Sequence, residues 1–122
     1  MDPITGALVS FFATQIFKQI LKNWSAILAW FKNLITGIVD IFKQKGQGVY
    51  HAIEAYAEMV SSGMATFRNK LYYQENYSYI EEVQENYLNQ SEIPNWVREK
   101  VQVGQGESEI TSEIQHELRM TF

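Results

Sequence analysis

Large apolar side chains recur every three or four residues through the first third of the chain. The successive steps of 4, 4, 4, 4, 3, 4, 3, 4 and 4 residues match one face of an α-helix. This apolar stripe consists of Leu8, Phe12, Ile16, Ile20, Trp24, Ile27, Phe31, Leu34, Ile38 and Phe42. Lysines and hydroxyl residues occupy the opposite face. The pattern predicts a continuous or gently kinked helix that ends near Gln44, and Asn23 to Ser25 is where it could break.

A second apolar pattern of helical spacing runs from about Val49 to Asn89. Its positions include Ile53, Val60, Met64, Phe67, Leu71, Ile80, Val83 and Tyr87. Gly46 and Gly48 come just before it, and each is a poorer helix former than Ala by about 1 kcal/mol. We therefore predict a hinge at Gly46 and Gly48, which lets the second helix fold back antiparallel on the apolar stripe. The alternative is one helix that runs straight through the hinge.

The last third of the chain shows shorter patterns. Trp96, Val97 and Val101 predict a short helix from about residue 94 to residue 102, and Ile110, Ile114 and Leu118 predict a final helix. No segment shows a convincing alternation of apolar and polar residues. The predicted fold is therefore all-α, a long amphipathic N-terminal helix or helical hairpin followed by short helices, with no sheet. It forms a single structural unit with three segments, residues 1–45, 46–90 and 91–122.

Charge divides the chain into two unequal parts. Residues 1–45 have a net charge of +3 and residues 46–122 a net charge of −7. The acidic part lacks the basic stripe that nucleic-acid binding needs, so we expect no nucleic-acid partner. The uncharged run before Lys18 is shorter than the roughly 20 residues of a membrane span. The N-terminus is not a typical signal peptide, which predicts a cytoplasmic, membrane-peripheral or virion-associated protein.

The sequence offers little catalytic or metal-binding chemistry. It has no Cys, which excludes disulfides and thiolate ligands. On a helix, His51, Glu54 and Glu58 would share one face, and a metal site there would need further ligands from another helix. A solvated polar face is the simpler interpretation, both for these residues and for the glutamates at 81, 82 and 85. We predict no catalytic residues, no metal site, no cofactor and no small-molecule substrate.

Residues 24–42, WSAILAWFKNLITGIVDIF, resemble the hydrophobic Trp- and Phe-rich helices of phage-tail tape-measure proteins. Those proteins are long and helical and line the tail tube, and regions of them are thought to reach the host membrane. The resemblance is one of composition, and the chain is far shorter than a tape measure. It implies a small structural component of such an assembly. The same pattern is also similar to membrane-active helical peptides and small pore-forming effectors.

Three functions follow from the apolar stripe. The first is a non-enzymatic structural protein that forms homo-oligomers through the stripe, for example within a phage-tail-like assembly. The second is a membrane-active or pore-forming protein that binds an anionic membrane surface through the same residues. The third is an adaptor or chaperone for a hydrophobic partner helix. In all three, the apolar stripe is the surface that binds the partner or the membrane.

Overall fold

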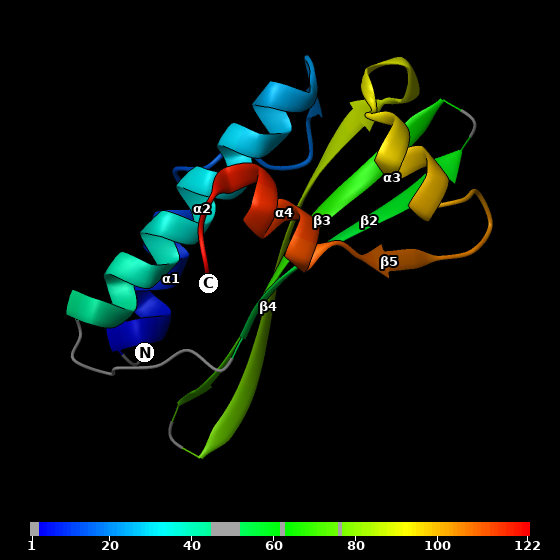
Figure 1. The fold of residues 1–122 in the computed structure, drawn as a ribbon. Helices are drawn as coiled ribbons and strands as arrows, with labels where there is room; N and C mark the ends of the chain where they lie inside the picture. The colour runs from blue at the N-terminus through cyan, green and yellow to red at the C-terminus, as the bar shows by residue number, and fades with distance from the viewer. Residues whose placement is uncertain (1–2, 45–51, 62, 76) are drawn as a thin grey trace.

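The computed structural model describes residues 3–44, 52–61, 63–75 and 77–122, which form an α/β fold with a layer of helices on a mixed sheet (Figure 1). The prediction of an all-α fold with no sheet is wrong. In chain order the elements are α1 (Pro3–Phe12), β1 (Ile20–Leu21), α2 (Trp24–Gln44), β2 (Ala52–Ser61), β3 (Met64–Glu75), β4 (Ser78–Asn89), a 3₁₀ turn (Gln90–Glu92), α3 (Asn95–Lys100), β5 (Glu107–Glu109) and α4 (Thr111–Leu118).

Three long strands form the centre of the sheet, whose order is β1-β4-β3-β2-β5. β2, β3 and β4 follow one another as an antiparallel meander, with Ala57 opposite Phe67 and Phe67 opposite Asn86. β5 lies antiparallel to β2 at one edge. β1 lies parallel to β4 at the other edge and pairs only with Tyr87 and Leu88. The sheet therefore joins residues from all three segments of the sequence.

The segment predicted as a second helix is the β2–β3–β4 meander. β2 alternates strictly, with Ile53, Ala55, Ala57 and Met59 buried and the intervening side chains partly exposed. In β4 buried and exposed positions also alternate, but the buried side chains of Gln84 and Asn86 are polar, whereas the apolar Val83 faces the open side of the sheet. Ile80 therefore lies on one face of β4, and Val83 and Tyr87 lie on the other. Their spacing of three and four residues in the sequence resembles that of a helix, although they do not share a face. The hinge glycines, Gly46 and Gly48, lie outside the described residues.

The predicted long N-terminal helix is two helices with an extended segment between them, so the continuous helix is wrong. α1 ends at Phe12, residues 16–21 run along β4, and α2 begins at Trp24. The side-chain oxygen of Asn23 accepts a hydrogen bond from the backbone N–H of Ala26 at 2.9 Å. This bond satisfies a donor in the first turn of α2, as an N-cap does.

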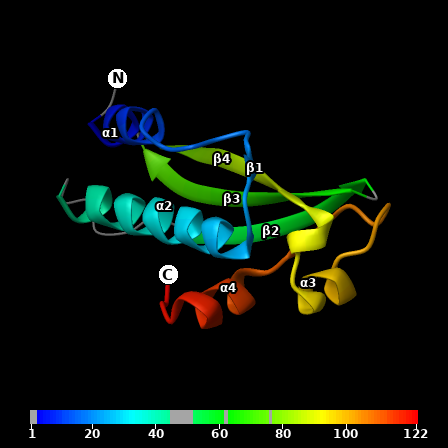
Figure 2. The ribbon, with the colours of Figure 1, turned by 90° about the horizontal axis from the view of Figure 1, so that it is seen from above.

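The described helices all pack over one face of the sheet, with α1 on the β4 side, α2 in the middle and α4 on the β2 side (Figure 2). α1 approaches α2 closely at Gly37, where a Cβ atom would overlap the ring of Phe11. The indole of Trp24 contacts Phe67 and Trp96, with ring centroids 5.5 and 5.8 Å apart. α3 and α4 lie where the sequence predicted short helices, and they complete the core with Val97 and Ile114.

Candidate functional site

Most of the apolar stripe lies in the core of its own chain. Six of its ten members are buried against the sheet and neighbouring helices, namely Leu8, Ile27, Phe31, Leu34, Ile38 and Phe42. Phe12 and Trp24 are partly buried in the same core, whereas Ile16 and Ile20 are about half exposed, at 52% and 53%. Assembly or lipid binding through the stripe remains a prediction, and as the chain is folded here it could use only these outer members directly.

The length and composition of α2 would alone let this helix cross a membrane. The core helix of a soluble protein meets the same criterion, and so does a signal sequence, which lies near an N-terminus as α2 does. In this fold α2 buries Phe31, Leu34 and Ile38 completely against other elements of the chain. The apolar character of α2 is therefore accounted for by the core.

The outer edge of β4 is paired along only half of its length. The N–H of Lys18 donates to the carbonyl of Glu85 at 2.9 Å, and the N–H of Tyr87 donates to the carbonyl of Gln19 at 2.9 Å. Together with the β1 pairs, these bonds cover β4 from Glu85 onward. Within the described residues no strand pairs with the outer side of residues 78–84. An open edge of this kind is a template for another extended chain.

Asn86 determines where the covered half begins. It is fully buried, its side-chain N–H donates to the carbonyl of Ile16 at 2.6 Å, and its side-chain oxygen accepts from the N–H of Gln19 at 3.0 Å. One amide therefore holds both ends of the segment from Ile16 to Gln19 against β4. Lys18, between them, adopts a left-handed conformation with φ of 56°. Asn86 is a positioning residue for the edge.

A groove of about 590 Å³ lies beside the uncovered half of β4. Its apolar wall comes from the end of α1 and the segment after it, through Val9, Phe12, Ala13 and Phe17. Its other wall is residues 82–85 of β4, and Lys18 lies at its end. Val9 is 50% exposed and Val83 is 42% exposed, so both are available to a partner. The close contact of Phe11 with Gly37 fixes α1, and so the apolar wall, on α2.

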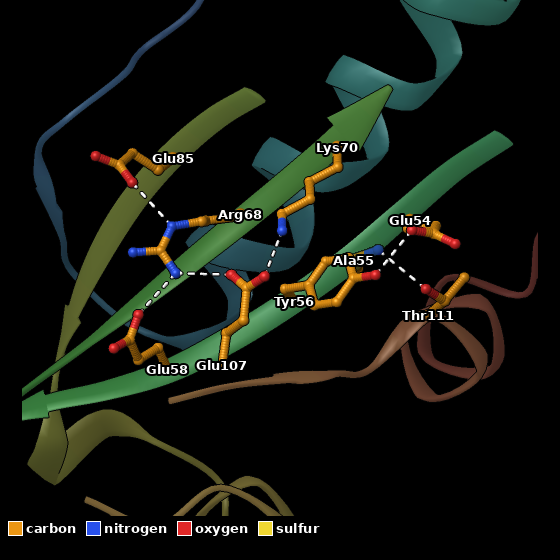
Figure 3. A network of polar contacts seen from close by, with 9 residues as sticks. All are labelled: Glu54, Ala55, Tyr56, Glu58, Arg68, Lys70, Glu85, Glu107 and Thr111. Atoms are coloured by element: carbon orange, nitrogen blue, oxygen red, sulfur yellow. Dashed lines mark hydrogen bonds and ion pairs between the residues drawn. The ribbon is translucent and has the colours of Figure 1, made fainter. Parts of the chain in front are cut away.

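The open face of the sheet carries a network of charges (Figure 3). Arg68 in β3 pairs with Glu58 at 2.9 Å, with Glu107 at 3.0 Å and with Glu85 at 3.1 Å, and Lys70 also pairs with Glu107. One guanidinium thus links strands β2, β4 and β5 through β3. Burial alone would lower the pKa of Arg68, but the hydrogen bonds that its guanidinium donates to the three carboxylates raise this pKa above its usual value.

Tyrosines on this open face respond to the same excess of negative charge. Burial raises the pKa of Tyr72 to about 12, with a further contribution from its hydrogen bond to Glu81. Burial also raises the pKa of Tyr56, whose hydroxyl donates to Glu54 at 2.8 Å. Both phenols stay protonated at neutral pH. The open face is therefore acidic and rich in hydrogen-bonding groups, with its two cations already paired to carboxylates.

The opposite edge of the sheet is covered over the middle of β2, from Ala55 to Glu58. The N–H of Ile110 donates to the carbonyl of Ala55 at 2.8 Å, and the N–H of Ala55 donates to the hydroxyl of Thr111 at 3.0 Å (Figure 3). β5 then covers β2 from Tyr56 to Glu58. The chain itself thus provides the strand and the hydroxyl that occupy this side of β2.

Sequence reasoning did not find this candidate site. It placed the residues at 81, 82 and 85 on a solvated helix face, and it gave no role to Val9, Phe17 or Asn86. The available signal was the four β-favouring residues Tyr79, Ile80, Val83 and Tyr87, and it was masked by the five polar residues among them, two of which are buried. Among the described residues no group of three or more acidic or His side chains is placed to hold a metal ion. Glu54 and Glu58 lie on strand β2, and His51 lies outside the described part of the chain.

Comparisons of this chain with family models, with curated proteins and with solved structures found no match.

Proposed function

We propose that this chain is a non-enzymatic protein-interaction module that adds an extended segment of a partner protein to its sheet along the first half of β4. The observation that carries the proposal is an uncovered strand edge beside an apolar groove. Strand addition gains affinity from backbone hydrogen bonds and specificity from pockets for alternate side chains. Residues 78–84 supply the edge, and the wall formed by Val9, Phe12, Ala13 and Phe17 supplies the pocket.

The groove beside the uncovered part of β4 supports this function over a purely structural role. Natural sheets usually cover or blunt their edges, because an open edge invites unwanted pairing. The described residues cover β2 from Ala55 to Glu58 and β4 from Glu85 onward, and the groove adjoins the uncovered part of β4. The uncovered part is seven residues long, enough for a short peptide strand of ordinary length.

A selection experiment with two variants at one position tests the proposal. A displayed library of random nine-residue peptides is selected separately on the parent, on Val83→Pro and on Val83→Thr. The N–H of Val83 points away from β3, so proline removes an edge donor without breaking the β3–β4 ladder. Threonine keeps that donor and the β-branched shape.

We expect the parent and Val83→Thr to enrich the same peptides, and Val83→Pro to bind them at least about tenfold more weakly, equivalent to one or two hydrogen bonds. Circular dichroism and thermal unfolding verify that the proline variant is folded. In the parent, NMR should show the amide signals of Glu81 and Val83 shifting as an enriched peptide is added. Enrichment that is equal on all three proteins, with those two amides unmoved, would refute strand addition at β4.

A further inference from the structure

The backbone of β4 presents its edge groups in a defined pattern. The N–H and C=O groups of one strand residue point to the same side, and they alternate from residue to residue. The carbonyl of Glu85 and the N–H of Tyr87 face away from β3, toward Lys18 and Gln19. The N–H and C=O groups of Glu81 and Val83 therefore face the same outer side. No described residue pairs with them, so they can align an added strand over several residues.

The side chains of an added strand would alternate between two different environments. Those that point to the helix side of the sheet would enter the groove, next to the apolar wall of Val9, Phe12, Ala13 and Phe17. Burying a large apolar side chain there removes nonpolar surface from water on both partners. Alternate positions of the partner should therefore be large and apolar.

The intervening side chains would lie on the open side, beside the odd-numbered residues of β4. Glu81 is exposed there, and it forms no ion pair with a described basic residue. Glu82 is an even-numbered residue that lines the groove on the helix side; it likewise has no described ion-pair partner, so it adds negative charge to the edge without lying beside the intervening side chains. Glu85 shares Arg68 with two other carboxylates, so the local negative charge is only partly neutralised. Lys18 is the single described cation in the groove lining.

Resting on the strand-addition function, we infer that the partner segment alternates large apolar residues with Lys or Arg. Its basic side chains would face the acidic, tyrosine-bearing side of the sheet, and its apolar side chains would fill the groove. A second copy of this chain does not fit the edge. Pairing β4 with itself antiparallel around Glu82 would bring the acidic residues at 81 and 82 of two chains together, which is unfavourable.

Three synthetic peptides separate the chemistry of the partner from the existence of the site. The probe is a capped nine-residue peptide that alternates Lys and Val. The second peptide replaces every Lys with Glu, and the third replaces it with Thr. Binding is measured by calorimetry on the full chain, and the amide signals of Glu81 and Val83 report where each peptide binds. Because charge complementarity sets the preference, we expect the Lys peptide to bind at least about tenfold more tightly than the Glu peptide.

Two double variants with equal net charge provide the matched control. Glu81→Lys with Glu82→Lys reverses the charge at the edge, and Glu99→Lys with Glu117→Lys makes the same change at exposed positions on α3 and α4. The edge variant should lose about tenfold in affinity for the Lys peptide and gain affinity for the Glu peptide. The remote variant should stay within about twofold of the parent, since distant exposed charges are screened by salt.

The outcomes distinguish this inference from the proposed function. Equal binding of the three peptides, or equal losses in the two double variants, would overturn the basic partner. If the amides of Glu81 and Val83 still shifted and Val83→Pro still prevented binding, strand addition itself would stand. If no alternating peptide shifted these amides, both the partner class and strand addition at β4 would be wrong.

Discussion

Each of the two outer edges of this sheet is covered along only part of its length, by different means. At the β2 edge, Ala55 has both of its backbone groups satisfied by Ile110 and Thr111, and β5 covers the next three residues. At the β4 edge, a short β1 and the side chain of Asn86 cover the strand only from Glu85 onward. The described residues thus cover the middle of the β2 edge and the second part of the β4 edge, and the groove lined by Val9 and Phe12 lies beside the uncovered part of β4.

The comparison shows two solutions to one physical problem. Backbone groups that are already paired, such as those of Ala55, need no further protection. An uncovered edge needs a device that prevents it from pairing with its own copies, and charged side chains serve this purpose in natural sheets. Glu81 and Glu82 are placed to do so at β4. Their repulsion disfavours pairing with a second copy, which is consistent with the basic partner strand that we propose.

The largest effect is expected when the helix layer beneath both edges is disrupted. Replacing Phe31 and Ile38 by Glu places two carboxylates where the native side chains have no exposure. Each buried unpaired charge costs several kcal/mol, and together they approach the whole stability of a small domain, about 5–15 kcal/mol. We expect global unfolding, with loss of the strand signal in circular dichroism.

The matched control for this change is Lys32→Glu with Thr36→Glu, which alters exposed positions of the same helix. It should remain folded and unfold in urea close to the parent. A Phe31 and Ile38 double variant that kept its sheet would show that α2 does not hold the sheet together.

A smaller effect is expected when the open edge is made longer. Asn86→Leu removes two hydrogen bonds and leaves the carbonyl of Ile16 and the N–H of Gln19 without their partner. We expect a loss of about 2–3 kcal/mol in the free energy of unfolding. Hydrogen exchange should show the amides of Lys18 and Tyr87 becoming less protected.

Asn89→Leu, at the exposed end of β4, is the control for Asn86→Leu. The amides that close the β2 edge, such as that of Ile110, should exchange as in the parent. Unchanged protection of Lys18 and Tyr87 would mean that β1 holds the covered half without Asn86.

Uncovering the β2 edge at Ala55 should have a smaller effect still. Thr111→Val keeps the shape of the side chain but removes the hydroxyl that accepts from the N–H of Ala55 and donates to Glu109. Leaving one buried N–H unpaired should cost about 1–2 kcal/mol. Thr111→Ser, which keeps the hydroxyl, should be close to the parent in urea unfolding. Equal losses in the two variants would assign the effect to packing of the Thr111 methyl group.

The helices of this fold were easier to predict than its strands. The spacing of Ile27, Phe31, Leu34 and Ile38 follows the helical period because one face of α2 rests on the sheet. The alternation of β2 was not recognised in the sequence because two of its buried positions are Ala55 and Ala57, and Ala favours helices. Intrinsic propensity was overridden here by tertiary packing, as is common for strands.

The site itself could not have been found from local patterns. The contact of Asn86 with Ile16 joins residues 70 positions apart, and no periodicity shows it. Whether β4 lies at an edge depends on the strand order, which the chain fixes only when folded. The acidity of residues 81–85 was visible in the sequence, but its placement beside an apolar groove was not.

The smallest expected effect is a dependence of stability on pH at the β2 edge, through Glu107. Partial burial alone would raise the pKa of the Glu107 carboxyl, but the hydrogen bonds and charges of Lys70 and Arg68 lower it below the ordinary value of 4.5. A lowered pKa stabilises the folded state above that ordinary value, and the stabilisation is lost as the pH falls through the folded pKa. Because Glu107 belongs to β5, acid should weaken the pairing of β5 with β2.

Glu107→Gln should be less stable than the parent by about 0.5–1 kcal/mol at pH 7, allowing for solvent screening of this partly exposed carboxylate. Urea unfolding of both proteins from pH 7 to pH 3 should show this difference shrinking below pH 4.5. A constant difference across that range would show that the charge of Glu107 does not hold β5 on the sheet.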